Sequence, residues 1–146
     1  MRIAIGCDPN AAQLKDQVSA VVTSLGHELT DLGSPDPVYA NVAIAVATAV
    51  AAGEYDRGIV ICGTGIGVSI AANKVPGCYC ALVTDAYQAQ RATLSNNANV
   101  IALGAQVTGV EVAKLLVTEY LAHTYDPESR SAPKVARITE YEARGA

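Results

Sequence analysis

Aromatic side chains are scarce in this chain. It has no Phe and no Trp, so seven Tyr supply all of its large aromatic side chains among 146 residues. Apolar residues nevertheless make up 51% of the sequence, so the hydrophobic core must be built from Ala, Val, Ile and Leu. That composition suits helices packed on a buried parallel sheet, whose strands are aliphatic runs. With only 16% charged residues, the composition excludes a disordered chain.

Positive charge and long apolar runs are also lacking. Ten Lys and Arg stand against fourteen Asp and Glu, a net charge of −4, and no basic cluster is present. We therefore expect neither nucleic acid nor a membrane surface as a partner. The longest nearly uncharged stretch, Val38–Gly53, is too short to span a bilayer. The first apolar run stops at Asp8, too early for a signal peptide, so we expect a cytoplasmic protein.

Cysteine is infrequent and its spacing is unfavourable for metal binding. The four Cys residues contain no CxxC pair, and with only two His they make no zinc set. We expect reduced, mostly buried thiols and no metal site.

Two patterns of apolar residues, one typical of strands and one of helices, alternate along the chain and indicate a single domain over residues 1–146. Short aliphatic runs predict strands at Arg2–Gly6, Glu28–Leu32, Gly58–Cys62, Cys80–Val83 and Val100–Leu103. Helical spacing predicts helices at Ala12–Leu25, Tyr39–Ala52, Gly67–Lys74, Ala86–Ser95, Gly109–His123 and Ser131–Ala143. This alternation is typical of βαβ units, which form a parallel sheet with helices on both faces.

Polar or Gly-containing turns follow the predicted strands. In an open α/β sheet, ligands bind beyond the carboxyl ends of the strands, where the strand order reverses. Three regions are therefore candidates for a ligand site: Cys7–Asn10, Cys62–Ser69 and the surroundings of Asp85.

The segment Cys62–Lys74 is the most informative of these. Its glycines let the backbone approach a ligand, and free N–H groups at a helix start bind anions. The anion could be a phosphate or the oxygen of an enediolate. The spacing of Gly63, Gly65 and Gly67 is not the dinucleotide fingerprint, and no P-loop Lys-Ser/Thr pair follows. A simple tight turn is the alternative.

Cys62 ends a predicted strand and faces the start of the next helix. That setting favours the thiolate, which would act as a base or a nucleophile. The alternative is a small apolar side chain that closes the strand. Asp8 similarly suits either a hydroxyl-binding carboxylate or a helix N-cap. The remaining Cys and His residues are interpreted as structural: Cys7, Cys78, Cys80, His27 and His123.

Several segments together resemble one known family. They are Ile5-Gly6-Cys7-Asp8, Tyr39, Cys62–Lys74 continued by Val75-Pro76-Gly77, Ala81–Asp85, Ser95-Asn96-Asn97-Ala98-Asn99-Val100 and the basic C-terminal helix. The chain resembles the ribose-5-phosphate isomerase B and galactose-6-phosphate isomerase family over nearly its whole length.

This resemblance implies a fold, an assembly and a reaction. The fold is a three-layer αβα Rossmann-like domain with a five-stranded parallel sheet and a C-terminal helix. The assembly is a homodimer or a dimer of dimers, with sites between subunits. The reaction is aldose–ketose isomerisation of a sugar or sugar phosphate through a cis-enediolate, without metal or organic cofactor.

The resemblance also implies roles for particular residues. Cys62 would be the general base, because the position of the Glu that some family members use instead is Val68 here. Backbone N–H groups from Gly63 to Gly67 would hold the oxyanion. The implied catalytic residues are Cys62, Thr64, Gly65 and Gly67. The implied substrate-binding residues are Asp8, Tyr39, Gly63, Ser69, Ser95, Asn96, Arg130 and Lys134, with Asn96 coming from the partner subunit and Arg130 and Lys134 holding a phosphate.

Three positions depart from the family pattern. Pro9 replaces the His after the first Asp, Ser95 replaces a His credited with opening the sugar ring, and Gln106 replaces a phosphate-binding Arg.

Two substrate assignments stay open on this basis. The first is ribose 5-phosphate interconverted with ribulose 5-phosphate. The alternative is a tetrulose 4-phosphate, which is open-chain because its O4 is esterified, or a free aldose. A non-catalytic sugar-binding module is a further alternative, whereas the glycine spacing disfavours a dinucleotide oxidoreductase.

Overall fold

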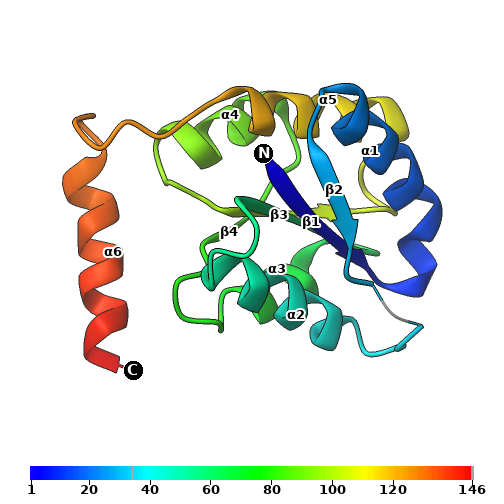
Figure 1. The fold of residues 1–146 in the computed structure, drawn as a ribbon, viewed down its shortest axis with the longest axis horizontal. Coiled ribbons are helices and arrows are strands. Elements are labelled where there is room, and N and C mark those ends of the chain that lie inside the picture. Colours follow the sequence, from blue (N-terminus) through cyan, green and yellow to red (C-terminus); the bar gives the residue numbers. More distant parts are fainter. Residues whose placement is uncertain (34, 146) are drawn as a thin grey trace.

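The computed structural model describes residues 1–33 and 35–145, which form a five-stranded sheet flanked by helices (Figure 1). All neighbouring strands run parallel, in the order β2-β1-β3-β5-β4. The strands are β1 (Arg2–Cys7), β2 (Glu28–Asp31), β3 (Arg57–Cys62), β4 (Cys80–Leu82) and β5 (Val100–Gly104). The five predicted strands are therefore confirmed, each within about one residue of its predicted bounds.

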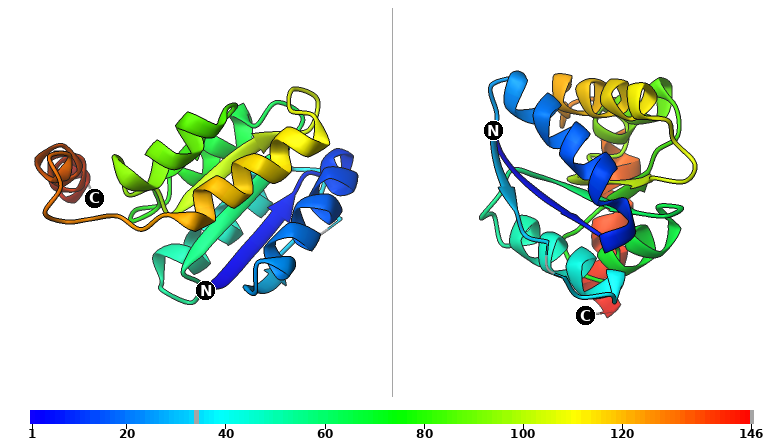
Figure 2. Two further views of the ribbon diagram at one scale, coloured as in Figure 1. Left: turned by 90° about the horizontal axis from the view of Figure 1, so that it is seen from above. Right: turned by 90° about the vertical axis from the view of Figure 1, so that its right-hand side faces the viewer.

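Helices cover both faces of this sheet (Figure 2). On one face lie α1 (Ala12–Ser24), α4 (Ala86–Leu94) and α5 (Val110–Ala122); on the other lie α2 (Tyr39–Ala51) and α3 (Ile66–Ala72). A short 3-10 turn, Pro9–Ala11, leads into α1. Asp85 is the N-cap of α4, because its Oδ1 accepts a hydrogen bond from Gln88 N at 2.9 Å. This bond accounts for Asp85 as a structural residue.

The core is aliphatic, as the composition predicts. Every residue of β3 and of β5 is buried, and strand side chains alternate between the two faces. Large side chains such as Ile59, Ile61 and Leu103 pack under α1, α4 and α5, whereas smaller ones such as Ala4, Val60 and Ala102 pack under α2 and α3. The only aromatic side chain in the core is Tyr120, within the part of the chain described.

The strand order places a switch point between β1 and β3. From β1 the chain continues to β2 on one side, and from β3 it continues toward β5 and β4 on the other side. The carboxyl ends of β1 and β3 are joined by a hydrogen bond from Asp8 N to Ile61 O at 2.8 Å. Cys7 and Cys62 therefore end neighbouring strands at the place where α/β sheets bind ligands.

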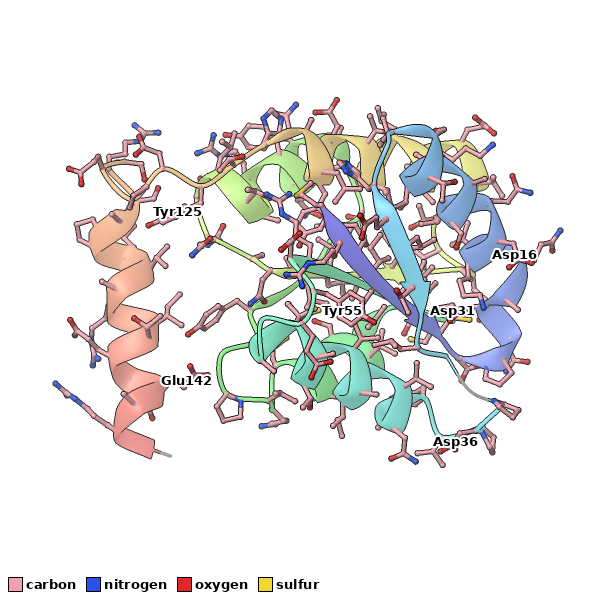
Figure 3. All side chains as sticks on the ribbon, viewed as in Figure 1. Asp16, Asp31, Asp36, Tyr55, Tyr125 and Glu142 are labelled. Carbon is pink, nitrogen blue, oxygen red and sulfur yellow. The ribbon has the colours of Figure 1, made fainter. Side chains whose placement is uncertain are left out.

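The last helix, α6 (Ala132–Gly145), stands apart from the rest of the fold (Figures 1 and 2). Val135 is its only buried residue. Glu142 points from α6 toward the body (Figure 3) and accepts hydrogen bonds from Gly77 N at 3.1 Å and Tyr79 Oη at 2.9 Å. Burial and this carboxylate raise the pKa of Tyr79 to about 12. The helix is thus attached to the rest of the chain by Val135 near its N-terminal end and by Glu142 near its C-terminal end.

The segment that leads to α6 starts at the C-terminal end of α5, which Arg57 holds in place. Arg57, at the start of β3, donates hydrogen bonds to the carbonyl oxygens of Tyr120 and His123 at the end of α5. Its guanidinium also lies 4.8 Å from the centre of the Tyr120 ring. A buried cation at a helix C-terminus satisfies carbonyl groups that have no intrahelical partner.

In residues 1–33 and 35–145, no helix is long and apolar enough to cross a membrane. The same residues contain no group of three or more His, Cys, Asp or Glu side chains arranged to hold a metal ion.

Candidate active site

A cavity of about 220 Å³ opens at the carboxyl ends of β1 and β3. Its walls come from the turn after β1, the start of α2, the turn between β3 and α3, and the segment after β5. The lining residues are Asp8, Asn10, Tyr39, Cys62, Gly63, Thr64, Gly67 and Gln106. Six of them are residues implicated by the sequence, so the structure brings together segments that are distant in the chain.

Cys62 lies at the inner wall of this cavity. It is the last residue of β3 and only 5% exposed, packed with Val60, Val68 and their neighbours. Its Sγ accepts a hydrogen bond from the backbone N–H of Gly65 at 3.1 Å. A backbone donor aimed at sulfur stabilises negative charge there. A thiol that borders a cavity and receives such a bond can act as a base or a nucleophile.

The turn that delivers this donor requires glycine at position 65. Gly65 has φ +79°, the left-handed region, and is the N-cap of α3. A Cβ there would lie 2.6 Å from Leu82 Cδ1 and 2.9 Å from the carbonyl carbon of Leu103. Sterics and backbone conformation therefore both exclude a side chain at this position.

The N–H groups of the turn divide between structural and free ones. The first four N–H groups at a helix start have no intrahelical acceptor. Gly65 N donates to Cys62 Sγ, and Ile66 N donates to Thr64 Oγ1 at 3.3 Å. Ser69 N already bonds to Gly65 O at 3.1 Å within the helix. In the described residues, the N–H groups of Gly63, Thr64, Gly67 and Val68 have no acceptor, and of these four residues Gly63, Thr64 and Gly67 line the cavity.

Tyr39 forms the opposite wall. It is the first residue of α2, 42% exposed, and its ring lies directly over Gly67. A Cβ on Gly67 would come within 2.5 Å of that ring. The absence of a side chain at Gly67 therefore lets the tyrosine ring close one side of the cavity.

Asp8 caps a turn and also borders the cavity, so its hydroxyl-binding role stays a prediction. Its Oδ1 accepts a hydrogen bond from Asn10 N at 2.9 Å, which caps the 3-10 turn, and the residue also lines the cavity. Gln106 N donates to Gly63 O at 2.8 Å, and the Gln106 side chain packs beside Gly63. Polar groups therefore line the cavity beside Cys62 on several sides.

The other cysteines are poor candidates for a reactive thiolate. Burial raises the pKa of Cys78 and of Cys80 to about 12, and burial also raises the pKa of Cys7. Ser69 makes a side-chain hydrogen bond to Cys80 and does not line the cavity. Gly65 lies behind the wall as well, so these two implicated residues are placed outside the lining.

The remaining implicated residues lie in a second cavity of about 430 Å³ between α4 and α6. Ser95 and Asn96 follow α4, Arg130 lies in the turn before α6, and Lys134 lies in the first turn of α6. Asn97, with φ 51°, ends α4 in the left-handed turn that places Asn96 at the surface. The complete lining is Tyr87, Arg91, Ser95, Asn96, Arg130, Ser131, Lys134, Val135 and Ile138. It contains three cations and no carboxylate.

The two cavities share no residue, so within this chain the implicated residues that line a cavity fall into two separate groups. Among the lining residues, Asn10 belongs to the candidate region Cys7–Asn10, whereas Arg91 was missed by sequence reasoning. For Arg91 a signal was present, since it precedes Ser95 by four residues on a predicted helix and therefore shares its face.

Comparison with known proteins gives consistent matches. The model of the Ribose/Galactose Isomerase family matches residues 3–138. D-erythrulose-4-phosphate isomerase 2 of Mycolicibacterium smegmatis is 53% identical over 104 residues, covering 71% of this chain and 68% of that protein. D-erythrulose-4-phosphate isomerase of Pectobacterium atrosepticum is 44% identical, covering 97% of this chain and 95% of the relative. The solved Ribose-5-Phosphate Isomerase B of Clostridium thermocellum superposes with a TM-score of 0.93 at 40% identity, covering 100% of both chains.

We predict that Gly65→Ala lowers both stability and any chemistry that depends on Cys62. The matched control is Gly26→Ala, because Gly26 has φ +80° and a Cβ added there would meet nothing within 4 Å. The control should lose only the backbone term, about 1 kcal/mol of unfolding free energy in urea. Gly65→Ala should lose clearly more, since it adds the clashes with Leu82 and Leu103. Equal losses in the two variants would contradict a tightly packed turn.

Proposed function

Because the chain belongs to the Ribose/Galactose Isomerase family of sugar-phosphate isomerases, we propose that its substrate pair is D-erythrulose 4-phosphate and the corresponding aldose. The names of the two relatives described above support a four-carbon substrate. The observation that carries the proposal is Ser95, which occupies the position of the ring-opening His in the resemblance noted from the sequence. A serine hydroxyl does not titrate near neutral pH and is a poor general acid. A substrate with a blocked O4 needs no ring opening.

Ribose 5-phosphate is the second candidate. The solved Ribose-5-Phosphate Isomerase B from Clostridium thermocellum superposes over the whole chain, which supports a site of similar shape. With this substrate, ring opening would be left to solution or to another group. The closed ring form would then limit turnover.

In the proposed mechanism, the Cys62 thiolate removes a proton from C1 of the open-chain ketose. The C–H electron pair becomes the C1=C2 bond, and the carbonyl electrons move onto O2, giving an enediolate. The thiol exchanges its proton with water and then protonates C2, while the proton of the C1 hydroxyl passes to O2, leaving an aldehyde at C1. C1 has lost one hydrogen and C2 has gained one, so no external oxidant or reductant is needed. The free N–H groups of Gly63, Thr64 and Gly67 stabilise the oxyanion.

Sugar hydroxyls are bound by the polar wall of the same cavity. Asp8 accepts hydrogen bonds from hydroxyl groups, and Thr64 and Asn10 offer further polar contacts. Tyr39 covers the bound chain and limits access of water.

The phosphate of the substrate is assigned to the second cavity, supplied by another copy of the chain. Arg130 and Lys134 are cationic, and the two halves of the site share no residue within one subunit. Exposed apolar side chains on α6, Ile138 at 49% and Tyr141 at 71%, support coverage of this helix by a partner. A homodimer, or a dimer of dimers, would complete each site with the second half from the neighbour.

A kinetic panel tests the substrate assignment. One preparation is assayed by NMR with D-erythrulose 4-phosphate, ribose 5-phosphate, allose 6-phosphate and unphosphorylated erythrulose. We expect kcat/KM for the tetrulose phosphate to exceed that for ribose 5-phosphate by at least about 100-fold, the scale of one missing general acid. A preference for ribose 5-phosphate would overturn the four-carbon assignment. Binding of these sugars without turnover would instead support a non-catalytic module.

Replacement of the proposed base tests the mechanism. We expect Cys62→Ala to lower kcat by at least about 100-fold with little change in unfolding temperature, because proton transfer loses its base. The matched control is Cys80→Ala, which removes a thiol outside the lining of the Cys62 cavity and should retain most activity. Near wild-type turnover by Cys62→Ala would remove Cys62 from the mechanism.

Mixed oligomers test whether sites are shared between subunits. The Cys62→Ala chain lacks the base of the first cavity, and the Arg130→Ala chain lacks a phosphate-binding cation of the second cavity. After unfolding and refolding together, half of the dimers are mixed, and each mixed dimer would regain one intact site. We expect about one quarter of wild-type activity at low substrate concentration. Activity no higher than the mean of the two variants would show that both halves come from one chain.

A further inference from the structure

Arg91 is the one cation of the second cavity that neither the family resemblance nor the function proposed above assigns. It lies in the last turn of α4 and is half-buried. Its Nε donates a hydrogen bond to Ser95 Oγ at 2.7 Å, and its Nη2 donates to the same oxygen. The backbone reinforces this pair, since Ser95 N donates to Arg91 O at 2.9 Å. Arg91 and Ser95 therefore form one fixed unit facing the cavity.

This pairing determines what the serine hydroxyl can do. A hydroxyl has two acceptor lone pairs and one O–H donor. Two N–H groups of Arg91 occupy the acceptor side of Ser95 Oγ. The O–H is then left to donate, and a cation beside it disfavours any positively charged partner. Ser95 is thus set to bind an oxygen acceptor on a ligand.

The guanidinium of Arg91 also has N–H donors that Ser95 does not use. Of its five N–H groups, two point at Ser95, and the other three have no acceptor in the described residues. Arg91, Arg130 and Lys134 line a cavity without any acidic residue. Arginine is suited to phosphate because its planar fork places two N–H donors on two oxygens.

The position of this charge fits the departures found in the sequence. Gln106 stands where an arginine was expected, and Pro9 where a histidine was expected, so two polar contacts to a phosphorylated sugar are missing. Arg91 supplies a cation from a different element, α4, next to Ser95, which is the third departure.

We infer that Arg91 is a third cationic ligand for the phosphoryl group and that it holds Ser95 as a hydrogen-bond donor to the same substrate. This inference rests on the proposed function for its substrate class. Arg91 and Ser95 act as binding and positioning residues, because neither supplies nor removes the transferred proton.

The experiment compares Arg91→Gln and Arg91→Lys with the matched control Arg137→Gln. Arg137 is exposed on α6, lies over the Tyr141 ring and does not line the cavity. Binding of inorganic phosphate to the full chain is measured by calorimetry, with unfolding temperature as the check on folding. We expect Arg91→Gln to weaken phosphate binding by about tenfold, the scale of one charge-assisted bond. The phosphate affinity of Arg91→Lys should fall between those of wild type and Arg91→Gln, because lysine keeps the positive charge but lacks the paired N–H donors of the guanidinium.

Kinetics add a readout specific to positioning. For D-erythrulose 4-phosphate, Arg91→Gln should raise KM with a smaller change in kcat, while kcat/KM for unphosphorylated erythrulose should stay at the wild-type value. In a Ser95→Ala background the effect of Arg91→Gln should shrink by at least about threefold, because the two residues act together. Strict additivity would overturn the coupling of Arg91 to Ser95.

The outcomes separate this inference from the proposed function. Phosphate affinity and KM in Arg91→Gln equal to those in Arg137→Gln would overturn the role of Arg91, even if the enzyme isomerises tetrulose phosphate. Absence of turnover with every sugar phosphate would overturn the proposed function, while calorimetry would still decide whether Arg91 binds phosphate. A wild-type chain that binds no phosphate would overturn the inference directly.

Discussion

The hydrogen bond from Gly65 N–H to Cys62 Sγ is the contact on which the active-site account depends. It exists because the chain leaves β3, turns through a left-handed glycine and enters α3 within a few residues. Leu103 and Gly104 at the end of β5 lie against this turn, so the sheet itself fixes its path. One backbone donor is thus committed to sulfur, and the N–H groups of Gly63, Thr64 and Gly67 remain without an acceptor at the cavity.

The second constraint is the division of the site. The thiol, the polar wall and Tyr39 surround one cavity, whereas the cations surround another between α4 and α6. In the proposed function, one chain supplies the proton-transfer half of each site and a second chain supplies the half that holds the phosphate. The weak attachment of α6 to its own subunit, with Val135 as its only buried residue, fits a helix stabilised by assembly.

The sequence predicts the layers of the fold well, because aliphatic strands and amphipathic helices have different periods. Cys62, Gly67, Thr64 and Asp8 also follow from the rule that ligands bind at the carboxyl ends of parallel strands. Other features depend on three-dimensional detail. The path of α6 is set by Glu142 and its two donors, which no periodicity encodes. The Arg91–Ser95 pair depends on side-chain rotamers, and Ser69 turns toward Cys80 rather than toward the cavity.

The central claim is that the Cys62 thiolate exchanges a proton with the first two carbons of the substrate. Proton NMR in D2O tests it by following loss of the C1 hydrogen signal of D-erythrulose 4-phosphate and the deuterium content at C2 of the aldose. The account predicts deuterium at C2 with the wild-type protein and no exchange above the uncatalysed rate with Cys62→Ala. Exchange by Cys62→Ala at the wild-type rate would contradict it, because another group would then be moving the proton.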